Sequence, residues 1–173
     1  MKVFFVLIYL LLFQHSFSQL VTRGDSLSRV RADIIVTEVI GDEISDKCYL
    51  LFSIADKYYL IITKVGKYYK EYYIVDREIV KEKYCRVSKD TIIEHAFDTT
   101  GYRTEFLSLN SLDFKYEVAD LEPTYFYFRD LNGKKYGESR LTLLIKPVPI
   151  KGKIYYHLLD KLVSVIRRNI KGS

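Results

Sequence analysis

Two histidines lie beyond the apolar N-terminal segment, and each has a carboxylate nearby in the sequence. His95 directly follows Glu94 and lies shortly before Asp98, and His157 lies one helical turn before Asp160. A histidine beside a carboxylate can move protons in general acid–base catalysis. A metal site would need three or four converging ligands, and neither grouping has a known ligand spacing. We therefore predict no metal site, and Glu94 with His95 is the best acid–base pair that the sequence offers.

Signatures of nucleophilic catalysis and of cofactor binding are missing from the sequence. No G-x-S-x-G turn is present, and no glycine-rich loop follows a predicted strand to hold a phosphate. The chain has only 8 glycines, which disfavours a cofactor site lined by backbone. The neighbouring carboxylates of Asp42 and Glu43, and of Asp120 and Glu122, are more typical of turns than of a glycosidase pair. We expect no cofactor, and the catalytic residues of any enzymatic activity stay unassigned.

Tyrosine pairs are the strongest indication of a binding function in this sequence. The doublets at 58–59, 68–69 and 72–73 fall in a segment whose alternation and central Gly66 predict a hairpin. Adjacent residues of a strand point to opposite faces, so each doublet places one ring on each face of the sheet. One face is expected to enter the core. The other is then a ladder of tyrosines, either covered by the C-terminal helix or open to solvent.

The segment Thr124–Arg129 repeats this pattern, with both phenylalanines on one face of the strand and both tyrosines on the other. Tyrosine combines a flat apolar ring with a polar tip, so an open face of tyrosines suits a glycan or a peptide. The alternative is that these tyrosines are ordinary strand residues with cross-strand partners. The predicted binding face consists of Tyr59, Tyr68, Tyr72, Tyr125 and Tyr127.

Residues 1–18 have the organisation of a cleaved secretory signal peptide. Lys2 is basic, the run from Val3 to Phe13 is apolar, and Ser16 and Ser18 are small residues at the −3 and −1 positions of a cut. The apolar run is shorter than the ~20 residues that a membrane-spanning helix needs. We therefore predict that the protein is exported, to the periplasm or outside the cell, as a soluble protein.

Residues 19–173 are predicted to form a single globular extracytoplasmic domain, since this length can bury its own core. The chain has a net charge of +5, but its basic and acidic residues alternate, as in Lys81-Glu82-Lys83. A nucleic-acid-binding protein usually gathers its positive charge on one face, so we exclude nucleic acid as a partner. No second long apolar run follows, and we expect no stable membrane insertion after cleavage. An extracytoplasmic protein, a peptide or a glycan is the expected partner.

The chain has two cysteines, Cys48 and Cys85. An even number of cysteines in an exported protein favours a disulfide. On the chain-entropy model such a bridge would stabilise the fold by about 3–4 kcal/mol. The alternative is a pair of reduced cysteines that pack as small apolar side chains.

The composition favours strands, because tyrosine and the β-branched residues suit a pleated sheet. A short helix is expected at 89–97, with Ser88 as its N-cap. From Ile154 to Ile170, apolar residues recur every four positions, which predicts an amphipathic helix. Strands are predicted at 25–40, 48–54, 58–64, 67–75, 77–87, 103–109, 113–118, 124–129, 134–136 and 141–146.

These elements predict an α+β domain: a mainly antiparallel sheet of hairpins, with the C-terminal amphipathic helix packed on one face. The alternative is a β-sandwich with the helix as an appendage. The predicted function is that of a non-enzymatic binding or interaction module that uses the tyrosine-rich face. Two alternatives are an extracytoplasmic enzyme with a site assembled from scattered acid–base residues, and an inhibitor or structural protein that pairs through a sheet edge.

Overall fold

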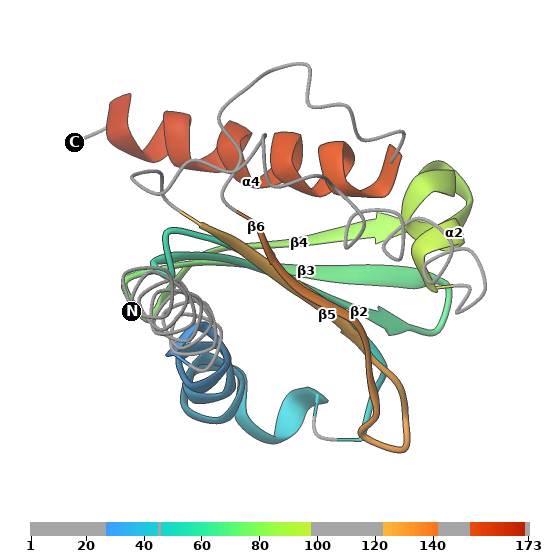
Figure 1. Cartoon of the computed structure of the whole chain (residues 1–173). Coiled ribbons are helices and arrows are strands. Elements are labelled where there is room, and N and C mark those ends of the chain that lie inside the picture. Colours follow the sequence, from blue (N-terminus) through green and yellow to red (C-terminus); the bar gives the residue numbers. More distant parts are fainter. Residues whose placement is uncertain (1–26, 45, 98–122, 142–152, 172–173) are drawn as a thin grey trace, which may run out of the picture.

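The computed structural model of the chain describes residues 27–44, 46–97, 123–141 and 153–171 (Figure 1). Its centre is one six-stranded antiparallel sheet with the strand order β4-β3-β2-β1-β5-β6. The strands are β1 (Tyr49–Ile54), β2 (Tyr58–Val65), β3 (Tyr68–Val75), β4 (Glu78–Arg86), β5 (Thr124–Arg129) and β6 (Lys135–Leu141). The predicted α+β class with a C-terminal helix is confirmed. Residues 1–18, the predicted strands at 103–109 and 113–118, and all but the first residue of the predicted strand at 141–146 lie outside the described residues.

Helices cover both faces of this sheet (Figure 1). The C-terminal helix α4 (Lys153–Lys171) and the short α2 (Thr91–Phe97), which follows the single turn η3 (Val87–Lys89), pack on one face. Residues 27–34 form an α-helix that continues into η1 (Ile35–Ile40) and η2 (Gly41–Ile44), and this N-terminal helix covers the other face. The sheet is therefore the middle layer of three.

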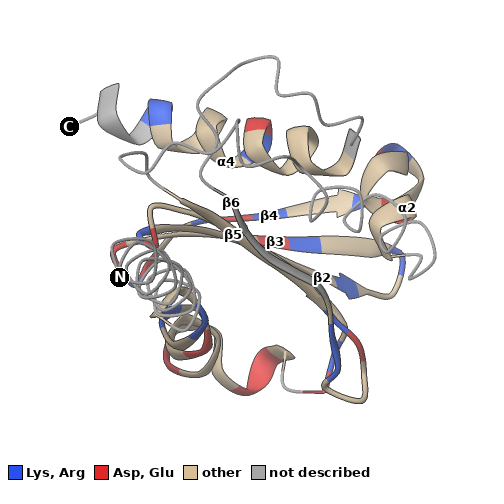
Figure 2. Ribbon diagram, in the orientation of Figure 1, with Lys and Arg blue, Asp and Glu red and all other residues tan. Residues whose placement is uncertain are grey.

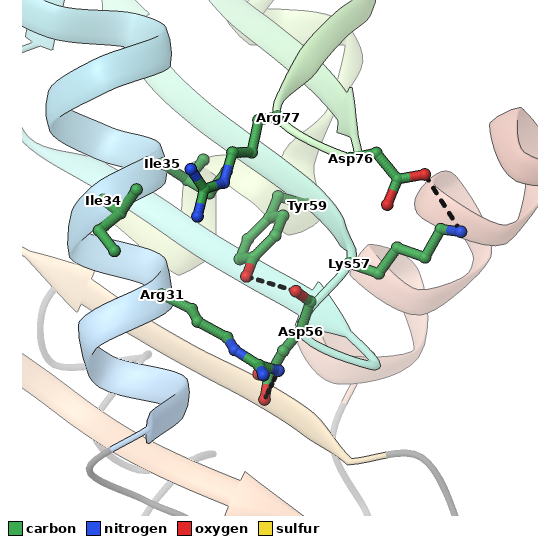
Figure 3. Close-up of a pocket in the computed structure, with 8 residues that line it drawn as sticks. All are labelled: Arg31, Ile34, Ile35, Asp56, Lys57, Tyr59, Asp76 and Arg77. Atoms are coloured by element: carbon green, nitrogen blue, oxygen red, sulfur yellow. Dashed lines mark hydrogen bonds and ion pairs between the residues drawn. The ribbon is translucent and has the colours of Figure 1, made fainter.

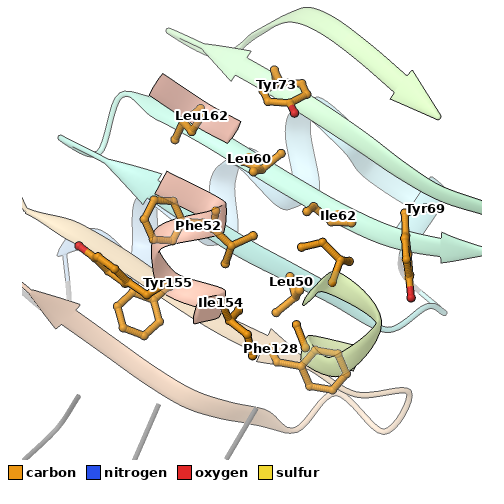
Figure 4. Packing of buried hydrophobic residues seen from close by; sticks show 14 of the residues in the cluster. Leu50, Phe52, Leu60, Ile62, Tyr69, Tyr73, Phe128, Ile154, Tyr155 and Leu162 are labelled. Carbon is orange, nitrogen blue, oxygen red and sulfur yellow. The ribbon is translucent and has the colours of Figure 1, made fainter. Parts of the chain in front are cut away.

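The core beneath α4 follows the predicted alternation. Leu50 and Phe52 from β1, and Phe126 and Phe128 from β5, point to this face and are buried. The stripe of α4 supplies the opposing side chains, and Tyr155 meets Phe52 edge to face at 5.5 Å between ring centroids (Figure 4). Burying one large apolar side chain contributes about 1.5–3 kcal/mol, so this layer carries much of the stability.

The predicted strand at 25–40 is wrong, because residues 27–40 are helical. Val30 and Ala32 fit a strand's alternation, yet Val30 is 56% exposed and Ala32 is fully buried. The buried positions Ala32, Ile35 and Ile40 instead follow the spacing of one helix face. The β-branched composition obscured this spacing, since such residues lower helix propensity only slightly and tertiary burial overrides it.

The helix at 27–40 also overturns the open tyrosine face. Tyr59, Tyr72, Tyr125 and Tyr127 lie on the face that this helix covers, and each is no more than 2% exposed. Their polar tips find partners inside the protein, as buried tyrosines usually require. The hydroxyls of Tyr127 and Tyr49 lie 3.2 Å apart, and the Tyr59 hydroxyl donates to the carbonyl of Asp56 at 2.9 Å. Of the five predicted residues only Tyr68 is open to solvent.

The predicted disulfide between Cys48 and Cys85 is also wrong, since both are free. The register of the sheet explains why. Cys85 pairs with Tyr69 and Tyr69 with Lys64, while Cys48 lies on the far side of Lys64 at the start of β1. Three strand spacings of ~4.8 Å separate the two cysteines by about 14 Å. A disulfide needs Cα atoms within about 7 Å, so the sheet holds these cysteines apart.

Candidate functional sites

An open groove lies at the end of the sheet where the β2–β3 hairpin turns. Its volume is about 730 Å³. The lining residues come from the hairpin turn, the end of β4, η3 and α2: Lys64, Gly66, Lys67, Tyr68, Arg86, Val87, Ser88 and Glu94. We call this site the turn groove.

The local sequence explains the shape of the turn groove. Gly66 has a φ of +59°, the conformation that the first central residue of a tight type II′ hairpin turn requires. Val65 and Tyr68 close the hairpin as a pair, and Tyr68 pairs in turn with Arg86. The amide of Val87 donates to the carbonyl of Lys67 at 3.0 Å, which holds the chain after β4 against the turn. The groove is thus built on the hydrogen-bonded ends of paired strands.

Three cations surround the turn groove. The side chains of Lys64, Lys67 and Arg86 are exposed, and none has an ion-pair partner within the part of the chain that the structure describes. Figure 2 shows this basic charge in blue at the tip of the hairpin. Glu94 is the one carboxylate among the lining residues that the structure describes. The groove therefore presents a net positive charge to solvent.

Aromatic surface continues from the turn groove onto β4. Tyr68 is 41% exposed and Tyr84 is 58% exposed. Tyr68 pairs with Arg86 while Lys70 pairs with Tyr84, so the two tyrosines are diagonal neighbours on one face of the sheet. Here the tyrosine-rich face extends past the N-terminal helix and reaches solvent.

A buried network of charges joins β3, α2 and α4. The ammonium of Lys161 lies 2.7 Å from Glu71 Oε1 and 2.9 Å from Asp90 Oδ2. The carboxylate of Asp90 also contacts His157 Nε2 at 3.0 Å and accepts from the Ile93 amide at 3.1 Å, which makes Asp90 the cap of α2. The predicted cap at Ser88 is therefore wrong, because α2 begins at Thr91.

The electrostatics of this network favour a structural role. Burial alone would raise the pKa of Asp90, but hydrogen bonds from His157 and Lys161 hold it well below its ordinary value. Burial likewise opposes the charge of Lys161, while its bonds to Glu71 and Asp90 raise its pKa. Both groups are therefore charged and mutually compensated at neutral pH. A catalytic acid or base would need a pKa near the working pH.

The acid–base pair expected from the sequence is placed differently. Glu94 and His95 are both exposed on α2, and Glu94 lines the turn groove. His157 contacts Asp90 rather than the predicted Asp160. Within the described ranges, no group of three or more His, Cys, Asp or Glu side chains is arranged to hold a metal ion.

The outer edge of the sheet at β4 carries alternating charges at Lys81, Glu82 and Lys83. Charged side chains on an edge strand discourage the addition of another strand. This feature counts against the alternative of a protein that pairs through its sheet edge.

A comparison of the chain with protein-family models, curated proteins and solved structures found no significant match. Among the helices that the structure describes, none is both long enough and apolar enough to cross a membrane.

Three members of the turn groove, Lys64, Lys67 and Arg86, were not among the site residues predicted from the sequence. Basic and acidic residues alternate along the chain, so no run of basic residues marks these three positions. Their like charges come close together only when the strands pair. A signal was nevertheless present. Lys64 and Lys67 flank the predicted turn at Gly66, next to the tyrosine doublet 68–69.

Proposed function

We propose that this protein is an exported, non-enzymatic binding module that holds an acidic oligosaccharide in the turn groove. The observation that carries the proposal is the set of three exposed, unpaired cations beside the exposed ring of Tyr68. Residues 1–18, with their signal-peptide organisation, support the export part.

The chemistry of the groove fits a chain of acidic sugars. Carboxylate or sulfate groups can pair with Lys64, Lys67 and Arg86, and a tyrosine ring offers a flat surface to the apolar face of a sugar. An exposed ion pair contributes only about 0.2–1 kcal/mol, so several contacts along a chain are needed. Binding is expected to be weak and to weaken further with added salt.

A peptide is a poorer fit to the described lining. Peptide ligands usually anchor a large side chain in a desolvated apolar pocket. Val87 is the one aliphatic side chain among the described lining residues, and the groove is open. We therefore favour the glycan and treat an acidic peptide as a competing outcome of the test.

A charge reversal at the turn tests this proposal. Lys67→Glu is expected to weaken binding of a short uronic-acid oligosaccharide by about tenfold, because it removes one attraction and adds one repulsion, together about 1.4 kcal/mol. Lys83→Glu is the matched control, since Lys83 is exposed on β4 but lies outside the groove. Calorimetric titration at low salt measures both affinities.

The same titration separates the alternatives. An uncharged oligosaccharide is expected to bind far more weakly than the acidic one. Equal weakening by both charge reversals would mean diffuse electrostatic attraction and would contradict the proposal. Tighter binding of an acidic peptide than of the acidic glycan would replace the proposed ligand.

A further inference from the structure

A second cavity lies at the opposite end of the hairpins from the turn groove, between the N-terminal helix and two neighbouring turns (Figure 3). Its volume is about 210 Å³. The turns are those between β1 and β2 and between β3 and β4, and they are tied together where the Asp76 amide donates to the Lys57 carbonyl at 3.2 Å. The lining residues are Arg31, Ile34, Ile35, Asp56, Lys57, Tyr59, Asp76 and Arg77.

Asp56 is the unusual residue of this cavity. Its side chain is only 9% exposed. One carboxylate oxygen, Oδ2, accepts from Ser28 at 3.1 Å and from Arg31 at 3.4 Å. The other oxygen, Oδ1, is buried and has no hydrogen-bond partner among the residues that the structure describes. A buried unsatisfied acceptor costs about 1–3 kcal/mol, and more when it is charged. A donor that reached Oδ1 would recover this energy.

Both turns hold non-glycine residues in the left-handed conformation. Ala55 and Asp56 have φ values of 61° and 49°, and Asp76 and Arg77 have 48° and 71°. Turns of this kind strongly prefer Asn-Gly or Asp-Gly. The chain thus keeps charged side chains around the cavity at positions where glycine would relieve strain, which is typical of functional sites.

We propose that this cavity binds a free aliphatic α-amino acid. The ammonium group of the ligand takes the place of Arg31 beside the Asp56 carboxylate, where it donates to Oδ2, which Arg31 leaves, and to Oδ1. Arg31 can give way because its contact with Asp56 is long and its side chain is half-exposed. The released guanidinium and the exposed Arg77 then pair with the ligand carboxylate.

The size and walls of the cavity agree with this ligand. A volume of 210 Å³ corresponds to about seven water molecules at ~30 Å³ each, which suits a molecule of amino-acid size. Ile34, Ile35 and the ring of Tyr59 form an apolar wall for an aliphatic side chain (Figure 3). Cations and carboxylates on the remaining walls match a zwitterion.

Titration of the protein with leucine, isoleucine and valine tests the proposal by calorimetry. At least one of them is expected to bind. Acetylating the amino group of that ligand should weaken binding by at least about tenfold, equivalent to 1.4 kcal/mol, and converting its carboxylate to an amide should weaken it too. Failure of all three amino acids to bind, or binding unchanged by acetylation, would overturn the proposal.

A pair of variants assigns the binding to Asp56. Asp56→Asn keeps the shape of the side chain and tolerates a left-handed turn, but it removes the negative charge. It is expected to weaken amino-acid binding by at least about tenfold, or 1.4 kcal/mol, while Asp46→Asn at an exposed position leaves it unchanged. Equal affinities of the two variants would place the amino acid elsewhere. The acetylated ligand tests the unaltered protein even if Asp56→Asn fails to fold.

Discussion

Tyr127→Ala is expected to lower the free energy of unfolding by about 3–5 kcal/mol, the usual cost of deleting a large buried aromatic side chain. Tyr127 is fully buried beneath the N-terminal helix, and its ring meets Tyr49 and Tyr125 edge to face at 5.8 Å between centroids. The substitution leaves a cavity and removes the partner of the Tyr49 hydroxyl. Urea denaturation followed by circular dichroism measures the change.

Tyr68→Ala is the matched control within the same set of predicted residues. Because Tyr68 is exposed, its removal should change the unfolding free energy by no more than about 0.5 kcal/mol. It should nevertheless weaken binding of the acidic oligosaccharide. Similar losses of stability from both substitutions would contradict the division of the tyrosines into a buried core and an exposed end.

Lys161→Met is expected to destabilise the protein by about 3–5 kcal/mol, because it leaves the buried carboxylates of Glu71 and Asp90 without their shared cation. Glu71 is fully buried and also accepts from the Tyr73 hydroxyl at 2.7 Å, so it cannot turn toward solvent without breaking that bond. Urea denaturation again measures the loss.

A second variant separates charge from packing at this network. Combining Lys161→Met with Glu71→Gln removes one uncompensated charge while keeping a hydrogen-bonding side chain. The double variant should therefore be more stable than Lys161→Met alone. If adding Glu71→Gln lowered the stability further, the cost would lie in packing and not in the unpaired charge.

Local patterns predicted the sheet well. The apolar stripe of α4 and the alternation in β5 each follow one regular period, and the structure buries Ile154, Leu158 and Leu162 of the stripe and both phenylalanines of β5 as expected. The turn at Asp130–Gly133 also forms, with the Asp130 carboxylate accepting from the amides of Asn132 and Lys134 at 2.9 and 2.8 Å. Such features depend on neighbours in the sequence, so a sequence reveals them.

Features that depend on distant contacts were not predictable in this way. Nothing near Tyr59 or Tyr127 in the sequence shows that residues 27–40 form a helix that covers them. The distance between Cys48 and Cys85 depends on the order of four strands. The link between Asp90 and Lys161 joins two helices that are far apart in the chain. Only the assembled sheet brings these groups together or holds them apart.

Nuclear magnetic resonance is the most direct test of binding in the turn groove. The isotopically labelled protein would be titrated with the short uronic-acid oligosaccharide while its backbone amide signals are followed. The expected result is a set of shifts concentrated at residues 64–68 and 86–88, which line or adjoin the groove. Shifts confined to other parts of the sheet or to α4, or no shifts at all, would contradict the proposed function.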